Sequence, residues 1–128
     1  KFKETANIHA EAFSGAELLH GPFALVKRDF PLFLFGQQDA TLKGILEVGA
    51  RVKKIGGKVL LALPDGDVSE KDKEYASTVV LPLPPSLHPI CDPLLVIQAF
   101  YIMMARLSVA RGYNPDEPDN LSKVTQTW

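Results

Sequence analysis

The sequence predicts an α/β domain with a mainly parallel sheet, and two features of its pattern carry that prediction. Three short apolar runs, at residues 30–36, 58–65 and 77–85, lack polar alternation and are bounded by Gly, Pro or Asp. Continuous apolar runs of this kind are typical of strands that are buried on both faces, as in parallel sheets. A segment with helical periodicity separates the first two runs, so strand, helix and strand follow one another.

The three strands are predicted near residues 31–36, 58–63 and 78–82. A three-stranded sheet is small for this class, so a fourth short strand could come from residues 9–13. Part of the polar connection before the third strand, residues 69–75, is predicted to be helical.

The helix between the first two strands is predicted over residues 40–55, because its apolar side chains recur at helical spacing. They are Leu42, Ile45, Leu46, Val52 and Ile55. We expect Asp39 to cap the start of this helix and Gly56 to end it.

A second, longer helix is predicted over residues 93–111, starting at Asp92 and Pro93. Its sequence, "DPLLVIQAFYIMMARLSVARG", is apolar nearly all round. Such a helix is expected to be buried on more than one face. The remaining residues, 113–128, carry prolines and no period, so no regular structure is expected there.

The composition excludes several classes of protein. At 128 residues the chain is the size of one domain, and a net charge of −1 argues against a nucleic-acid-binding protein. Its one cysteine cannot form an internal disulfide. No uninterrupted apolar run approaches the ~20 residues that span a bilayer. We expect a cytoplasmic protein with no membrane partner.

Motifs for phosphate loops, metals and serine nucleophiles are missing. The sequence has no GxGxxG, no GxxxxGK[ST], no HExxH and no GxSxG, and its three histidines are scattered. We therefore expect no cofactor and no metal.

Polar residues cluster at the two ends of the chain. Lys1 and Glu4 lie three residues apart and share a helix face. In "HAEAFSGAELLHGP", residues 9–22, Glu11 and Glu17 could be helix caps, and His20 could be a loop histidine. Considered individually, these residues need no functional role: Lys1 and Glu4 could form a solvated ion pair, and Lys123 could be an ordinary surface lysine.

Three stretches together are more informative than any one of these residues. They are "KFKETANIHAEAFSGAELLHGPFALV", "DPLLVIQAFYIMMARLSVARG" and "NPDEPDNLSKVT". In this order they resemble the sugar isomerase (SIS) domain family, in particular the second SIS domain of the isomerase half of glucosamine-6-phosphate synthase and its deaminase relatives. The resemblance covers nearly the whole chain. It implies a three-layer α/β sandwich of Rossmann-like or flavodoxin-like topology.

The resemblance also implies a domain organisation. Residues 1–128 would form a single SIS domain, the C-terminal half of a subunit with two such domains. The first strand of the family would then precede Lys1. The serine- and threonine-rich loop that binds phosphate in this family would belong to the other SIS domain, so these residues alone are expected to be inactive.

Four site residues follow from the resemblance, and all four residue types are kept here. Glu4 would be the base that moves a proton between sugar C1 and C2, and Lys1 would lie beside it in the substrate site. His20 would assist ring opening in the active site of a neighbouring subunit. Lys123 would form a Schiff base with the open-chain ketose. A carboxylate base, an imine-forming lysine and a histidine suit a carbonyl shift between neighbouring carbons.

The implied function is a phosphosugar isomerase-type enzyme that interconverts fructose 6-phosphate and glucosamine 6-phosphate. Its direction, as an aminotransferase or a deaminase, stays open, although Leu19 and the ending "KVTQTW" depart from the synthase pattern. The expected partners are a sugar phosphate and a second copy of the chain in a homodimer. The alternatives are a regulatory domain that senses sugar phosphates without catalysis, for which the catalytic set would be superfluous, and a degenerate domain that serves only dimerisation.

Overall fold

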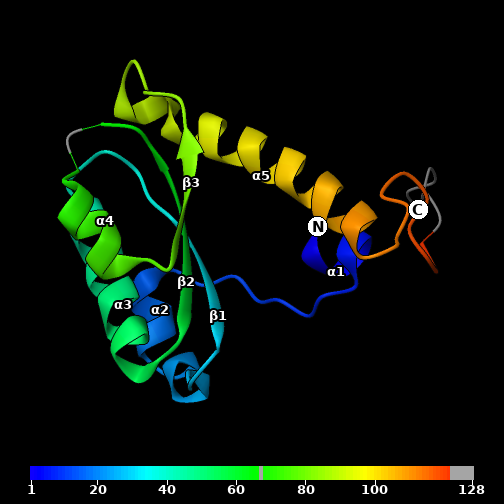
Figure 1. Cartoon of the computed structure of the whole chain (residues 1–128), viewed down its shortest axis with the longest axis horizontal. Coiled ribbons are helices and arrows are strands. Elements are labelled where there is room, and N and C mark those ends of the chain that lie inside the picture. Colours follow the sequence, from blue (N-terminus) through cyan, green and yellow to red (C-terminus); the bar gives the residue numbers. More distant parts are fainter. Residues whose placement is uncertain (67, 122–128) are drawn as a thin grey trace, which may run out of the picture. The chain divides into compact units, whose positions relative to one another are not determined.

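The computed structural model describes residues 1–66 and 68–121, and it divides into two compact units. One unit contains Lys1–Ala12 and the chain from Ala99 onward, and the other is Phe13–Gln98 (Figure 1). The long helix α5 (Asp92–Ala110) contributes residues to both. This division does not test the prediction of a single SIS domain.

The larger unit is built on a three-stranded parallel sheet. Its strands are β1 (Pro31–Phe35), β2 (Lys58–Pro64) and β3 (Val79–Leu83), in the order β1-β2-β3. Leu34 pairs with Leu61, which in turn pairs with Val80. The predicted α/β class, the three strands and their parallel direction are confirmed.

The central strand β2 is continuously apolar after its first residue, the exposed Lys58, and its burial explains why. It is hydrogen-bonded along both edges, and Val59 and Leu61 are fully buried. Ala62 and Leu63, which point to opposite faces because strand side chains alternate, are buried as well. A strand covered on both faces has no position for a polar side chain.

Helix α3 (Leu42–Ile55) begins later than predicted and ends as predicted. Gly56 takes the left-handed conformation, with φ 90°, at the C-cap. The expected cap at Asp39 is wrong, because the N-cap residue is Thr41. The Asp39 carboxylate instead accepts hydrogen bonds from the Thr41 N–H and hydroxyl, at 2.8 and 2.6 Å, which closes a turn before the helix.

Helices α3 and α4 (Glu70–Ala76) lie on the same side of the sheet (Figure 1). They approach so closely at Gly49 that a Cβ atom there would lie 2.4 Å from the Ala76 carbonyl oxygen. A Cβ atom at Gly44, which lies on a different side of α3, would have no atom within 4 Å. The Lys53 ammonium fastens the end of α4 by donating to the carbonyl oxygens of Glu74 and Ser77. The predicted helix over residues 69–75 is thus confirmed as α4.

The segment before the sheet forms no strand. Residues 9–13 have no regular structure, so the expected fourth strand is wrong for the described chain. The short helix α2 (Gly15–Leu19) begins with a capping box, in which the Ser14 hydroxyl accepts from Glu17 N–H and the Glu17 carboxylate accepts from Ser14 N–H. A 3₁₀ turn, η1 (Pro22–Leu25), follows it. Glu17 is therefore a cap, as expected, whereas Glu11 pairs with Lys3.

In the smaller unit the short helix α1 (Phe2–Ala6) packs against the second half of α5. The rings of Phe2 and Phe100 meet edge to face, with 5.5 Å between their centres. Ala6 is fully buried. After α5 the chain turns at Gly112 and continues through residues 113–121 without helix or strand, as predicted.

Helix α5 follows a 3₁₀ turn, η2 (Pro89–Cys91), and is far more exposed than the sequence predicts. The expected burial on more than one face is wrong within the described residues, because only 17% of its most apolar stretch is buried. Its exposed apolar residues are Leu94, Ile97, Tyr101, Ile102 and Val109.

By length and composition alone, residues Pro89–Ala110 would suffice to cross a membrane, with a mean hydropathy of 1.6. Only 17% of the most apolar stretch is buried. Core helices of soluble proteins meet the same criterion, so the absence of a membrane partner stays a prediction.

Replacing Leu61 by Asp is expected to unfold the larger unit. The new carboxylate would lie unpaired in the centre of the sheet, which costs several kcal/mol. Urea denaturation followed by circular dichroism measures the loss. Val79→Asp, at an exposed position of β3, is the matched control and should cost much less. A Leu61→Asp protein that unfolds cooperatively at the wild-type urea concentration would contradict the burial of β2.

Candidate active site

The smaller unit contains a polar pocket of about 660 Å³ between α1 and the segment that follows α5. This volume lies in the range of small-molecule sites, ~300–1,000 Å³. Its lining is contributed by Lys3, Glu4, Thr5, Asn7, Gly112, Tyr113, Asn114, Glu117, Pro118, Asp119, Asn120 and Leu121. The predicted base Glu4 is among them.

Lys1 and Glu4 form the ion pair that their spacing predicts. The Lys1 ammonium donates a hydrogen bond to the Glu4 carboxylate over 2.8 Å, and each side chain is about half exposed. This hydrogen bond, followed by the attraction of the Lys1 charge, lowers the pKa of Glu4 below its ordinary value. The same bond raises the pKa of Lys1. Glu4 is therefore ionised at neutral pH, as a proton acceptor must be.

The charges of the pocket favour some ligand groups over others. Among the described lining residues, Glu4, Glu117 and Asp119 supply three carboxylates, against the single ammonium of Lys3. Lys3 is itself paired with Glu11, whose carboxylate lies 2.7 Å from the Lys3 nitrogen. The lining therefore suits hydroxyl or amino groups and disfavours a phosphate. A phosphorylated ligand would need its phosphate to be held by groups outside this lining.

Two asparagines shape the walls of the pocket, and the sequence analysis missed both. Asn7 and Asn120 adopt the left-handed conformation, with φ 50° and 59°. Asn7 ends α1, and its amide donates to the Tyr113 hydroxyl over 3.3 Å. Asparagine tolerates this conformation better than most residues, which is the one local signal that could have marked these positions.

The roles of the other two predicted site residues, His20 and Lys123, stay predictions. Lys123 lies outside the described residues, two positions beyond Leu121. His20 belongs to the larger unit, where it is the exposed C-cap of α2. Its N–H donates to the Glu17 carbonyl over 3.1 Å.

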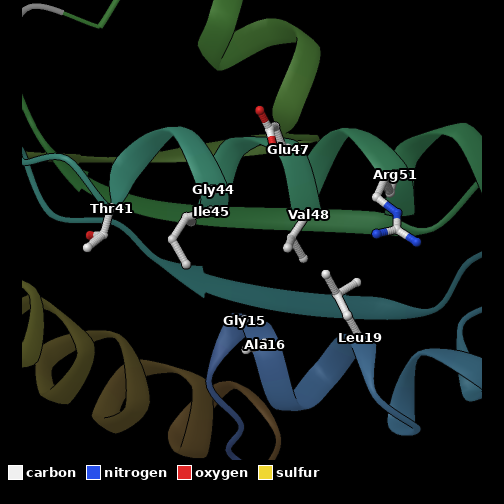
Figure 2. Close-up of a pocket in the computed structure, with 9 residues that line it drawn as sticks. All are labelled: Gly15, Ala16, Leu19, Thr41, Gly44, Ile45, Glu47, Val48 and Arg51. Atoms are coloured by element: carbon white, nitrogen blue, oxygen red, sulfur yellow. The ribbon is translucent and has the colours of Figure 1, made fainter.

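The residue before His20, Leu19, lines a mostly apolar groove between α2 and α3. This groove has a volume of about 320 Å³, and Figure 2 shows Leu19 facing Val48 across it. Arg51 lies at its edge, with its guanidinium 4.9 Å from the centre of the Phe23 ring. Thr41 and Glu47 complete its polar lining. These groups offer shape and apolar surface but no nucleophile and no paired acid and base.

A buried carboxylate, that of Asp92, lies at the carboxyl ends of the strands in the larger unit. One oxygen of the fully buried Asp92 accepts from the Gln38 N–H over 2.6 Å. The Gln38 side-chain amide donates to the carbonyl of Pro64, at the end of β2, over 2.8 Å. Asp92 thus ties the start of α5 to the loop after β1. Its Oδ1 has no partner among the described residues.

Metal ligands do not gather anywhere in residues 1–66 and 68–121. No three His, Cys, Asp or Glu side chains there lie close enough to hold an ion. The described lining of the polar pocket itself supplies carboxylates, amides, hydroxyls and the ammonium group of Lys3.

Relatives of known name match this chain over most of its length. It is 33% identical over 127 residues to glutamine–fructose-6-phosphate aminotransferase (isomerizing) of Thermus thermophilus, a match that covers 96% of the chain and 20% of the relative. The enzyme of the same name from Aeropyrum pernix is 34% identical, with 97% and 19% covered. The chain therefore spans about a fifth of the length of these relatives. No protein-family model matches it.

Solved structures give the same result. The C-terminal domain of glucosamine-fructose-6-phosphate aminotransferase from Francisella tularensis matches with a TM-score of 0.73 and 27% identity, covering 88% of this chain and 31% of that one. A protein from Silicibacter pomeroyi, assigned to the phosphosugar isomerases, matches with a TM-score of 0.72 and 35% identity, covering 90% and 32%.

The parallel sheet, its helices and these neighbours define the class: the chain has the α/β fold of a sugar isomerase (SIS) domain. More particularly, it is a phosphosugar isomerase-type domain homologous to the C-terminal part of glutamine–fructose-6-phosphate aminotransferase.

Replacing Lys1 by Met is expected to raise the pKa of Glu4. The variant removes both the hydrogen bond and the charge that lower that pKa, so protonation of Glu4 should occur at higher pH than in the wild type. A carbon-detected NMR titration of the Glu4 carboxyl group measures the change directly. Lys3→Met removes a neighbouring charge without breaking this hydrogen bond, and should shift the titration less. An unchanged Glu4 titration in Lys1→Met would show that the ion pair is not formed in solution.

Proposed function

We propose that this domain supplies half of the active site of an enzyme that interconverts fructose 6-phosphate and glucosamine 6-phosphate. The observation that carries the proposal is the ionised Glu4, paired with Lys1, on the wall of a sugar-sized pocket. The names of the homologous enzymes support the proposal, because they describe isomerizing aminotransferases of fructose 6-phosphate.

In the proposed mechanism Glu4 moves a proton between neighbouring sugar carbons. The Lys123 amine adds to the C2 carbonyl of the open-chain ketose and expels water, which leaves an imine. The imine withdraws electrons and makes the hydrogen on C1 more acidic. Ammonia then displaces the Lys123 amine from C2, which frees the lysine and leaves an imine of the sugar itself. Glu4 removes the C1 proton, the electron pair forms a double bond between C1 and C2, and the imine nitrogen takes up a proton. The proton held by Glu4 returns at C2 as the C1 hydroxyl loses its proton and becomes the aldehyde carbonyl.

His20 is assigned to the step before this one. A cyclic sugar phosphate must open before its carbonyl can react, and opening moves a proton from the anomeric hydroxyl to the ring oxygen. A histidine titrates near neutral pH and can carry such a proton. We assign His20 to the site of a neighbouring subunit, in a homodimer, and the phosphate to a loop outside this chain.

The direction of nitrogen transfer is a finer part of the proposal. Deamination consumes glucosamine 6-phosphate and water and yields fructose 6-phosphate and ammonium, whereas amination needs a supply of ammonia. Leu19 and the ending of the chain favour a deaminase-like member over the synthase itself. Ammonium release from glucosamine 6-phosphate, in the full chain and without glutamine, tests this direction.

Replacing Glu4 by Gln is expected to lower turnover by about two to four orders of magnitude, the usual contribution of a general base. Sugar-phosphate binding should change little, because the amide keeps the size of the carboxylate. Steady-state kinetics and calorimetric titration with fructose 6-phosphate separate the two effects. Glu11→Gln is the matched control on the same segment, outside the pocket lining, and should keep wild-type turnover. Binding without turnover in the wild type would instead indicate a sensor.

Mixing two inactive subunits tests the assignment of His20. If His20 serves the neighbouring site, a dimer of His20→Asn and Glu4→Gln subunits has one site with both changes and one with neither. We expect about half of the wild-type activity per mixed dimer, measured after subunit exchange and isolation of the mixed species by two affinity tags. Isolated mixed dimers that stay inactive would place His20 in its own subunit's site or outside catalysis.

A further inference from the structure

Helix α1, which carries Glu4, is too short to be stable by itself. It has five residues, whereas isolated helices shorter than ~12–15 residues are marginal in water. The last carbonyl groups of a helix have no partner within it and must find one elsewhere. The place of Glu4 therefore depends on whatever holds the end of α1.

Side chains from the end of α5 supply those partners. The Ser108 hydroxyl donates to the carbonyl of Thr5, and the Arg111 guanidinium Nε donates to the carbonyl of Ala6 over 2.9 Å. The Asn7–Tyr113 hydrogen bond adds a third tie one residue further on. These contacts join segments that are more than 100 residues apart in the chain but lie within one compact unit.

Packing alone does not explain why these residues are polar. Ser108 is fully buried on α5, where alanine would have a higher helix propensity and nothing to desolvate. Ser108 and Arg111 are three residues apart, so they share one face of the helix and reach successive carbonyl groups of α1. The hydroxyl gains the bond to α1 at this position, beside a longer contact of 3.5 Å with the Tyr113 carbonyl.

From these contacts we propose that Ser108 and Arg111 are positioning residues that fix α1, and with it the Glu4 carboxylate, against the pocket wall formed by residues 112–121. The proposal rests on the proposed role of Glu4 as the base. Both residues act through α1 and touch no substrate. Gly112 and Tyr113, which line one wall of the pocket, follow Arg111 directly. The turn that forms this wall therefore also carries a residue that holds α1, the opposite wall.

The distance between the Glu4 carboxylate and the reacting carbon determines how well Glu4 can act as a base. A misplacement of a reacting group by ~1 Å can lower turnover about 100-fold. Loss of either donor should let α1 fray, which moves Glu4 away from the reacting carbon. Fraying also separates Lys1 from Glu4, since their pairing needs one helical turn.

The test compares Ser108→Ala, Arg111→Met, Arg111→Lys and Arg106→Met in the full chain. Arg106 is exposed on the same helix and lines no pocket wall, so its replacement is the matched control. Ser108→Ala changes no charge, and Arg111→Lys retains one. The other charged groups around Glu4, which are Lys1, Lys3, Glu117 and Asp119, are the same in every variant.

We expect Ser108→Ala and Arg111→Met to lower kcat about 10- to 100-fold with KM changed less than about twofold. In both, the acid limb of the pH–rate profile should move to higher pH as the Lys1–Glu4 pair is lost, and Arg111→Lys should restore part of kcat. Arg106→Met should behave as wild type. A loss of activity that only follows the folded fraction, with an unchanged pH profile, would overturn the proposal.

Amide hydrogen exchange tests whether Ser108 and Arg111 hold α1, independently of whether Glu4 is the base. The N–H groups of Thr5, in α1, and Ile8, two residues after it, bond to the carbonyls of Lys1 and Phe2. Among the four variants, only Ser108→Ala and Arg111→Met should make these two N–H groups exchange faster. Faster exchange with unchanged kcat would overturn the positioning role. Full activity of Glu4→Gln would refute the proposed function, whereas unchanged exchange in both variants would refute the attachment of α1 to α5 by these two bonds.

Discussion

The pairing of β2 along both edges is the constraint on which the larger unit depends. A strand that is hydrogen-bonded to parallel neighbours on each side can be joined to them only by crossovers. Parallel strands have their carboxyl ends on the same side of the sheet, and the loop after β1, the end of β2 and the start of α5 meet there. Gln38 and Asp92 tie these three segments together there. Ligands of open parallel sheets bind at this side, although the described pocket with Glu4 belongs to the other unit.

Burial on both faces also explains which parts of the fold the sequence predicted well. A strand such as β2 has to be apolar where it is covered on both faces, so the apolar residues from Val59 to Pro64 coincide with the strand after its exposed first residue, Lys58. Gly56 ended α3 as predicted because few other residues tolerate a φ of 90°. Asp39 is not the cap of α3, because its carboxylate accepts from Thr41 and closes a turn that precedes the helix. Whether an aspartate caps a helix or closes such a turn depends on a few backbone dihedral angles. The exposure of α5 could not be predicted, since it depends on what else is present to cover that helix.

Only the part of the candidate site that is formed by residues close together in the sequence could be predicted. Lys1 and Glu4 are one helical turn apart, so their contact follows from the helix period. The opposite wall of the pocket depends on contacts such as Asn7 with Tyr113, between positions 106 apart, for which a single sequence contains no distance information. The resemblance to a known family supplied Lys123 and His20, which the residues alone would have left as an ordinary surface lysine and loop histidine. Their roles stay predictions.

Two glycines on α3 set opposite limits on how the domain could be made more stable. Glycine inside a helix costs about 0.5–1 kcal/mol relative to alanine, so both positions look equally open to improvement from the sequence. At Gly44 a methyl group would meet no atom within 4 Å and would only narrow the groove beside α2. At Gly49 it would collide with the backbone of α4 at Ala76, and the two helices would have to separate. An engineer who optimised helix propensity alone would gain stability at the first position and lose the α3–α4 contact at the second.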